Sequence, residues 1–264
     1  MNLNQLLGIA GVLLVILYVL PAVQLRAQLR SPGTPHLVPM AREGVGQPLG
    51  MLMGRLVDSL VNAGFTLLGF AEGPAPPGAS TGVLYIAELL APDRRTAALV
   101  YGKRRMTVSG EPEFSANVEY ATHFTNGGEV DSNSSTLLGF FIRSPRKLVF
   151  SFPDERDPIA LYQLHRHLIE RHGNRWQSRP EDPPATLDEA LARLREYWPR
   201  EMEQQAATGI YQRAGASAYR LTWYGAIRGV VMLGTPGKQI RLALVRQRAA
   251  KLAAELRALP EPTL

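Results

Sequence analysis

The hydrophobic pattern begins with one long apolar stretch near the N-terminus. No charged side chain precedes Arg26, and the segment LLGIAGVLLVILYVLPAV (6–23) is almost wholly apolar. About 20 such residues in a helix cross the hydrocarbon core of a bilayer. Pro21 stands near the end of the segment, where it stops a helix at little cost. The pattern therefore predicts a transmembrane anchor over residues 1–24, with residues 6–23 in contact with the lipid bilayer.

A cleaved signal peptide is the alternative interpretation of this stretch. Signal peptides carry basic residues before a shorter apolar core and a small-x-small cleavage site after it. No Lys or Arg precedes the apolar run, and the residues VQLRAQLRS (23–31) contain no such cleavage site. The sequence therefore favours a retained, single-pass signal anchor.

The basic residues around this anchor predict its orientation. Arg26, Arg30 and Arg42 follow it, and no basic residue precedes it. Because cytoplasmic flanks carry the excess of Lys and Arg, the body of the protein is expected in the cytoplasm.

The pattern changes twice after the anchor. Residues 25–48 contain four prolines and several glycines, which predicts an extended linker. The segment LGMLMGRLVDSLVNAG (49–64) then places Leu52, Leu56 and Leu60 at helical spacing, and Gly64 stands where a helix would end. A helix is therefore predicted at the start of the folded domain.

Strand-like segments follow this helix without intervening helices. Each is rich in β-branched or aromatic residues and is bounded by turn residues, and Asn126-Gly127 is a strong hairpin signal. The segments are 65–70, 83–90, 96–103, 114–124 and 147–152. Their succession predicts an antiparallel β-meander of about five or six strands.

Helical periodicity returns in the last third of the chain. Asp157-Pro158 opens one helix, Thr186 and Glu189 form a capping box for a second, and residues 237–259 carry a third. The predicted fold class is thus α+β: an N-terminal transmembrane helix, a helix, the meander and C-terminal helices. The predicted domains are an anchor (1–24), a linker (25–48), an α+β domain (49–219) and a basic amphipathic helical tail (220–264).

The charge distribution indicates a possible role for the tail. The net charge is +6, and residues 220–264 contain eight basic and two acidic side chains, so the whole excess lies there. Trp223 and Tyr224 are residue types that suit a membrane interface. The tail is therefore a candidate membrane-surface element, and a helix packed on the domain with a solvated cationic face is the alternative. The candidate surface residues are Trp223, Tyr224, Arg228, Lys238, Arg241, Arg248 and Lys251.

The hairpin stretch YATHFTNGGEVDSNSS (120–135) is the densest group of polar and aromatic side chains. A two-residue turn at Asn126-Gly127 would set the strand register. The pairs brought together on one face would be Tyr120 with Asn133 and Thr122 with Asp131, with His123 on the other face. These four residues form a candidate ligand-binding pocket. The alternative is that they only connect strand ends.

Other motifs give little support to enzyme chemistry. GASTG (78–82) lacks the strand–turn–helix context that a nucleophilic Ser80 requires, and GTPGKQ (234–239) departs from the P-loop pattern. HRHLIERH (165–172) has the wrong spacing for a zinc helix, and the chain has no cysteine. We therefore predict no catalytic residue, no metal site, no cofactor and no nucleic-acid partner.

The sequence thus favours a binding or interaction module at a membrane surface, with a protein partner of unknown identity. Two alternatives stay open. One is a hydrolase or transferase with a polar site near the Asn126-Gly127 hairpin, and the other is a module that senses a lipid surface.

Overall fold

The computed structural model describes residues 2–74, 83–106, 111–136, 144–216, 218–234 and 237–260. Ser80 and part of the GTPGKQ segment therefore lie outside the described residues. The chain forms two compact units. Among the described residues, unit 1 holds 2–34 and 197–242, and unit 2 holds 35–136, 144–196 and 243–260.

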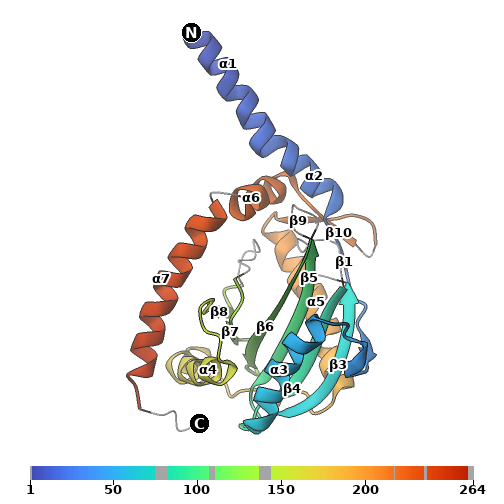
Figure 1. Cartoon of the computed structure of the whole chain (residues 1–264), viewed down its shortest axis with the longest axis vertical. Helices are drawn as coiled ribbons and strands as arrows, with labels where there is room; N and C mark the ends of the chain where they lie inside the picture. Colours follow the sequence, from blue (N-terminus) through green and yellow to red (C-terminus); the bar gives the residue numbers. More distant parts are fainter. Residues whose placement is uncertain are drawn as a thin grey trace. The chain divides into compact units, whose positions relative to one another are not determined.

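Unit 2 is built on a seven-stranded sheet in which sequential strands are neighbours (Figure 1). Pairing is antiparallel from β2 to β7, and β8 runs parallel to β7. The strands are β2 (Val38–Met40), β3 (Thr66–Pro74), β4 (Val83–Leu90), β5 (Ala97–Met106), β6 (Pro112–His123), β7 (Glu129–Asn133) and β8 (Lys147–Ser151). The α+β class is confirmed, but the sheet is mixed rather than a pure antiparallel meander.

One face of this sheet carries the main core of unit 2. Alternate strand residues such as Val100 and Tyr120 face it because successive side chains of a strand point to opposite faces. The helices that pack there are α3 (Leu49–Asn62), α4 (Pro158–Gly173) and the final turns of α7 (Gly237–Arg257). Leu60 of α3 and Leu161 of α4 are almost fully buried.

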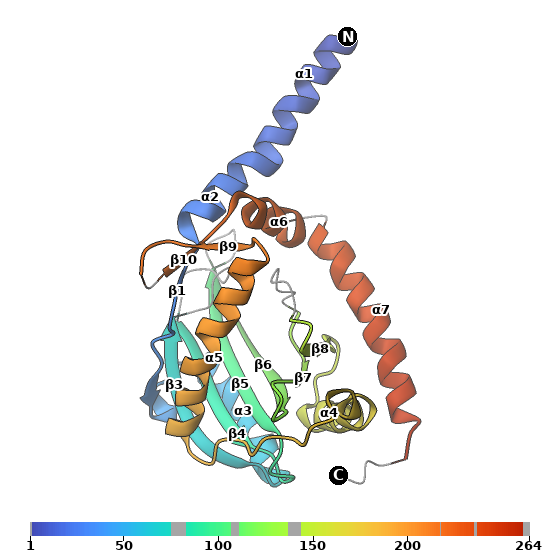
Figure 2. The ribbon, with the colours of Figure 1, turned by 180° about the vertical axis from the view of Figure 1, so that it is seen from behind.

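The other face is covered over part of its width by the start of α5 (Leu187–Ala207), as seen from behind in Figure 2. Leu187 and Leu191 of α5 pack with Ile86 of β4 and with Leu37, which precedes β2. Short 3-10 helices at η2 (Arg42–Gly44) and η3 (Asn174–Trp176) complete the unit.

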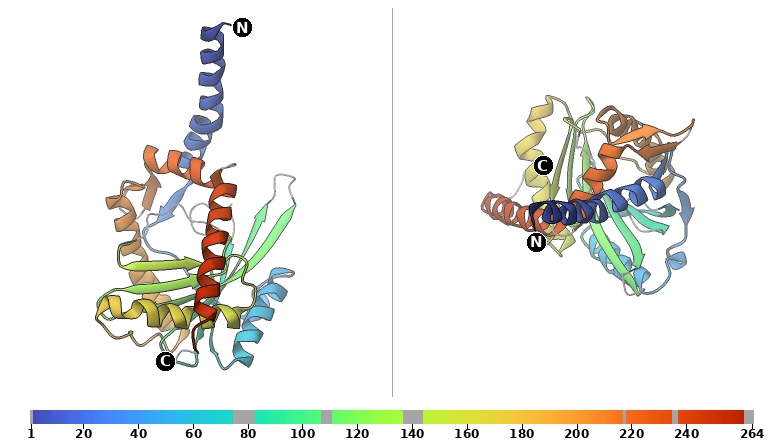
Figure 3. Two further views of the ribbon diagram at one scale, coloured as in Figure 1. Left: turned by 90° about the vertical axis from the view of Figure 1, so that its left-hand side faces the viewer. Right: turned by 90° about the horizontal axis from the view of Figure 1, so that it is seen from above.

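Unit 1 begins with three helical segments that follow one another directly (Figure 3). They are α1 (Leu3–Leu14), the π-helical segment η1 (Val15–Val19) and α2 (Leu20–Gln28). The wider π turns precede Pro21, which lacks an N–H donor and crowds the preceding turn, so the irregularity has a local cause. Among the described residues, no single helix combines the length and the apolar character that a membrane span requires.

The rest of unit 1 is a small three-stranded sheet with helices around it. Its strands are β1 (Arg30–Pro32), β10 (Ala218–Leu221) and β9 (Tyr211–Arg213), in that spatial order and antiparallel. The end of α5 and helix α6 (Trp223–Leu233) pack here, and Ala22, Met202 and Leu221 belong to the core. The segment expected to be a linker, 25–48, thus supplies β1 to this sheet and β2 to the larger one.

The hairpin register differs by one residue from the expected one. Phe124 pairs with Gly128 through an N–H to carbonyl bond of 2.8 Å, which leaves a three-residue loop in which Gly127 has a φ of +80°. This longer loop shifts β7 by one position, so Thr122 lies opposite Val130 and Ala121 lies opposite Asp131. A one-residue shift places every β7 side chain on the other face, so the expected pairing of Thr122 with Asp131 is wrong.

Candidate functional site

A group of acidic side chains lies on the face of the sheet that is turned away from α3 and α4. Cross-strand pairing places Glu119 of β6 opposite Asn133 of β7, and the same face continues to Asp131 and Glu129. Glu88 of β4 lies on this face as well, because both it and Glu119 pair with Leu99. We call Glu88, Glu119, Glu129 and Asp131 the carboxylate cluster.

The carboxylate cluster is unusually buried for charged side chains. The exposed fractions of Asp131, Glu129 and Glu88 are 1%, 6% and 8%, and Glu119 is partly buried. Buried carboxylates are costly unless they are paired or protonated. The chain must therefore supply a cation, protons, or both to this face.

Lys147 of β8 supplies the cation. Its Nζ atom lies 2.7 Å from Glu129 Oε1 and 2.5 Å from Asp131 Oδ2. Burial opposes ionisation of Glu129, but the Lys147 ammonium lowers the pKa of Glu129 below its usual range. Burial raises the pKa of Asp131 well above its usual value, and the charge on Glu129 adds to this effect. One ammonium thus stabilises one ionised carboxylate while its neighbour holds a proton.

The two remaining carboxyls of the cluster hold protons more tightly than usual. Burial raises the pKa of Glu88 to about 8, and the charge of Glu119 contributes. Burial also raises the pKa of Glu119, against the opposing effect of Lys147. The cluster therefore places proton donors beside a carboxylate that is ionised at neutral pH, an arrangement that suits hydrogen-bonded recognition or acid–base chemistry.

The surroundings of the cluster are polar. Tyr101 lies on the same face, and burial raises its pKa while a hydrogen bond to Ser135 opposes the change. His123 pairs with Glu129 across β6 and β7, and burial lowers the pKa of its imidazole. The Asp131 side chain is almost fully buried, and its carboxyl group is hydrogen-bonded to that of Glu129. Within those residues, no group of three or more histidine or acidic side chains has the arrangement to hold a metal ion.

Tyr120 and Thr122 lie on the opposite face, in the core beneath α4. The Tyr120 hydroxyl donates to the Pro158 carbonyl at 2.7 Å, and Thr122 Oγ1 lies 3.0 Å from Nε2 of His165. Ser132 lies 3.0 Å from the other ring nitrogen of His165. These bonds satisfy buried polar atoms of the core. The structure therefore brings Asp131 and Asn133 together with the cluster and separates Tyr120 and Thr122 from them.

Glu88, Glu119, Glu129 and Lys147 were not identified from the sequence. A signal does exist, because Glu88 interrupts an otherwise apolar strand, VLYIAELL (83–90). A single acidic residue of this kind marks either a solvated strand face or a buried charge. Only the cross-strand register shows that several such residues meet on one face.

A second notable feature is the exposed apolar surface of the N-terminal helical segments in unit 1. Between 42% and 58% of each large apolar side chain in this group is exposed. We call this group the apolar shell: Leu6, Ile9, Val12, Val15, Ile16, Leu17, Val19, Leu20 and Val23. The consecutive residues 15–17 point to different sides of the helix, so the exposed apolar surface is not confined to one face.

The candidate surface residues of the tail fall into the two units. Trp223 and Tyr224 of unit 1 are exposed, Arg228, Lys238 and Arg241 are half-buried, and Arg248 and Lys251 of unit 2 are exposed. In unit 2, Leu256 of α7 is fully buried in the core. Two neighbouring basic residues form ion pairs, Arg246 with Asp154 at 3.0 Å and Arg257 with Glu155. The end of the predicted tail is thus a packed helix of the domain.

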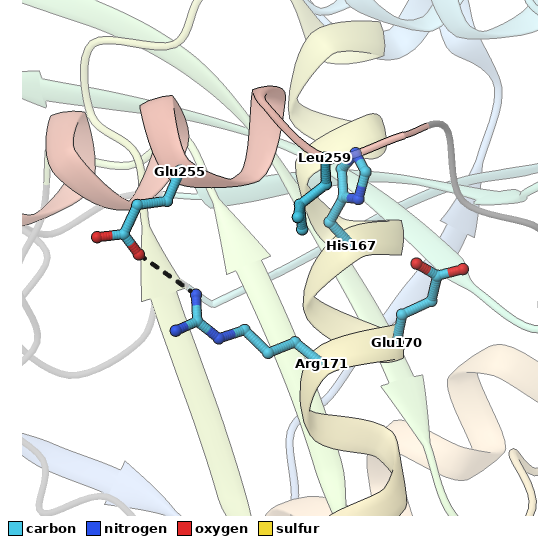
Figure 4. A pocket seen from close by; sticks show the side chains of 5 residues that line it. All are labelled: His167, Glu170, Arg171, Glu255 and Leu259. Atoms are coloured by element: carbon cyan, nitrogen blue, oxygen red, sulfur yellow. Dashed lines mark hydrogen bonds and ion pairs between the residues drawn. The ribbon is translucent and has the colours of Figure 1, made fainter.

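A shallow pocket of about 500 Å³ lies between α4 and the end of α7 in unit 2 (Figure 4). Five residues line it: His167, Glu170, Arg171, Glu255 and Leu259. Arg171 and Glu255 form an ion pair at 3.4 Å across the two helices, which neutralises part of the pocket's charge. The pocket is mixed in charge and open, so it offers less defined recognition than the carboxylate cluster.

Comparison with known proteins gives no further guide to the site. No family model, curated protein or solved structure matches the chain significantly. The case for a function therefore depends on the apolar shell and on the carboxylate cluster.

Proposed function

We propose that the chain is a single-pass, membrane-anchored binding module. The observation that carries the proposal is the apolar shell, which extends along α1 and η1 to the start of α2. Soluble proteins rarely expose contiguous apolar patches of this kind, because each patch favours transfer out of water. Lipid is the environment that covers a helix on all sides.

The length of the N-terminal segments is consistent with this proposal. The three segments contain 12, 5 and 9 residues and follow one another without a break. At about 1.5 Å per residue their combined length exceeds a hydrocarbon core of roughly 30 Å. Arg26 and Arg30 at the far end favour a cytoplasmic location for the body, since basic flanks are retained on that side.

The carboxylate cluster supports a binding role for the body. It combines four carboxyl groups with the Lys147 ammonium. Such a face suits a ligand or partner segment that presents hydrogen-bond donors or a positive charge. We propose recognition of this type, with a protein partner as the favoured ligand.

Membrane fractionation tests the anchor. The full-length protein should stay in the membrane pellet after an alkaline carbonate wash. Ile9→Lys combined with Ile16→Lys should release it, because each lysine near the bilayer centre costs about 3 kcal/mol. The matched control, Met51→Lys with Val61→Lys, alters two exposed apolar residues of α3 and should leave the protein in the pellet. Release of the unaltered protein by the wash would contradict the proposal.

One observation favours a second candidate, a hydrolase or transferase that uses the carboxylate cluster. Glu129 and Asp131 have pKa values displaced in opposite directions beside one ammonium, as an acid–base pair requires. Incubation of the purified protein with a metabolite extract, followed by mass spectrometry, tests this candidate. Turnover that Glu129→Gln abolishes would support an enzyme. Stable retention of a ligand without conversion would support the binding module.

A further inference from the structure

Helix α6 presents an apolar face that the described residues leave about half exposed. Trp223, Tyr224, Ile227 and Val231 recur at helical spacing on one side, and between 47% and 53% of each is exposed. Four large apolar side chains on an 11-residue helix are an unusual feature for a surface in contact with water.

The opposite side of α6 is made of small residues that fix its position. A Cβ atom at Gly229 would lie 2.6 Å from Leu25 Cδ2, and one at Gly225 would lie 2.1 Å from the Ile210 carbonyl oxygen. Ala226 between them is fully buried. Thr222 caps the helix by accepting a hydrogen bond from the Gly225 N–H at 2.9 Å. The backbone of α6 therefore lies close to α2, and the large apolar side chains are held outward.

This outward face adjoins the apolar shell. Helix α6 packs against both α2 and η1, as Figures 1 and 2 show for α2. The Arg26 guanidinium stacks 4.8 Å from the centre of the Trp223 ring, at the end of the apolar segment. Aromatic rings with neighbouring arginines are typical of the boundary between hydrocarbon and headgroups.

The charge of this region favours lipid over an average protein surface. In unit 1 no acidic residue follows Glu203, whereas Arg220, Arg228, Lys238 and Arg241 do. An apolar helix with a Trp-containing face, in a segment whose only charged side chains are basic, fits a bilayer that contains anionic lipids.

We propose that α6 is an interfacial helix that lies on the bilayer surface beside the anchor, with Trp223, Tyr224, Ile227 and Val231 among the headgroups and upper acyl chains. This inference rests on the proposed anchor and adds a second attachment to it. A single spanning helix leaves the attached unit free to rotate about the helix axis. A helix bound in the plane of the surface removes that freedom and fixes the orientation of unit 1.

Spin-label accessibility in nanodiscs of phosphatidylcholine and phosphatidylglycerol tests the inference. The chain has no cysteine, so single variants of the full-length protein accept one nitroxide each. The test positions are Ile227→Cys and Val231→Cys, Val12→Cys reports the anchor, and Gln163→Cys is an exposed reference on α4. The ratio of collisions with oxygen to collisions with a water-soluble nickel chelate measures how far a label lies in lipid. We expect this ratio to be several-fold higher for the labels at 227 and 231 than for the label at 163.

The outcomes separate the inference from the anchor. If the label at 12 is in lipid while those at 227 and 231 collide freely with the nickel chelate, α6 faces water and only the inference fails. Labels at 227 and 231 that are shielded from both reagents would indicate a protein contact, such as a second copy of the chain, and would also overturn it. Water exposure at position 12 would overturn both the anchor and the inference.

Discussion

The Lys147 ammonium lies 2.5 Å from Oδ2 of Asp131, a carboxyl group that is almost fully buried. The contact depends on the parallel pairing of β8 with β7, which places Lys147 beside Glu129 at the start of both strands. Without this strand the cluster would hold only acidic groups. The parallel strand β8 therefore supplies the charge that offsets the cost of burying these carboxyl groups.

Lys147→Met should destabilise the protein by about 3 kcal/mol. Removing one partner of a buried pair leaves the ionised Glu129 without its cation, and the loss exceeds that of an exposed pair. Chemical denaturation of the purified full-length protein measures the free energy of unfolding. Lys251→Met is the matched control, because Lys251 is exposed and its loss should change stability by about 0.5 kcal/mol or less. Equal losses in the two variants would contradict the assigned role of Lys147.

Glu88 should make the protein less stable as the pH rises. Its pKa is raised on folding from 4.5 to about 8, so the folded state keeps a proton that the unfolded state releases between these values. The free energy of unfolding should therefore fall between pH 4.5 and pH 8, by on the order of 4 kcal/mol. Glu88→Gln should remove this part of the pH dependence. Glu43→Gln, at an exposed position, should leave the pH profile unchanged.

His165 should make the protein less stable as the pH falls. Burial lowers the pKa of its imidazole to about 3, whereas an unfolded histidine titrates near 6.5. The unfolded state thus gains a proton first, and the free energy of unfolding should decrease as the pH falls from 6.5 towards 3. His165→Gln keeps a hydrogen-bonding side chain and cannot be protonated. Its profile should be flatter than that of the unaltered protein by up to about 1.4 kcal/mol per pH unit, and parallel profiles would show that His165 does not carry this effect.

Gly127→Ala should cost about 1–2 kcal/mol of stability. The residue has a φ of +80°, in the left-handed region where an L side chain is strained. Gly46→Ala is the control, because no atom lies within 4 Å of a Cβ there and no positive φ applies. Thermal unfolding of the two variants should give a clear decrease in midpoint for Gly127→Ala alone. A neutral effect at both positions would argue against the three-residue loop.

Regular elements with strong periodicity were predictable from the sequence. The segments 83–90 and 147–152 correspond closely to β4 (Val83–Leu90) and β8 (Lys147–Ser151), and the expected helix at 49–64 contains α3. These elements follow from residues that are near neighbours in the chain, so local periodicity and end signals are sufficient.

Features that depend on long-range geometry were not predictable. Asn126-Gly127 marked the turn correctly. One extra loop residue, however, places Asp131 on one face of the sheet and Thr122 on the other. The parallel direction of β8 has no local signature, since the spacing between Asn133 and Lys147 fits either direction. The carboxylate cluster depends on both features, and for this reason the sequence grouped Asp131 and Asn133 with Tyr120 and Thr122, which lie on the other face of the sheet.

The account depends most on the claim that the N-terminal segment crosses a bilayer, and single-cysteine labelling in intact cells tests this most directly. Asn2→Cys and Gln163→Cys each add one thiol to a chain that has none. A membrane-impermeant maleimide should label Cys at position 2 in intact cells and at position 163 only after the cells are disrupted. The reverse pattern would keep the crossing and invert the predicted orientation. Labelling of both positions from the same side would contradict the membrane anchor.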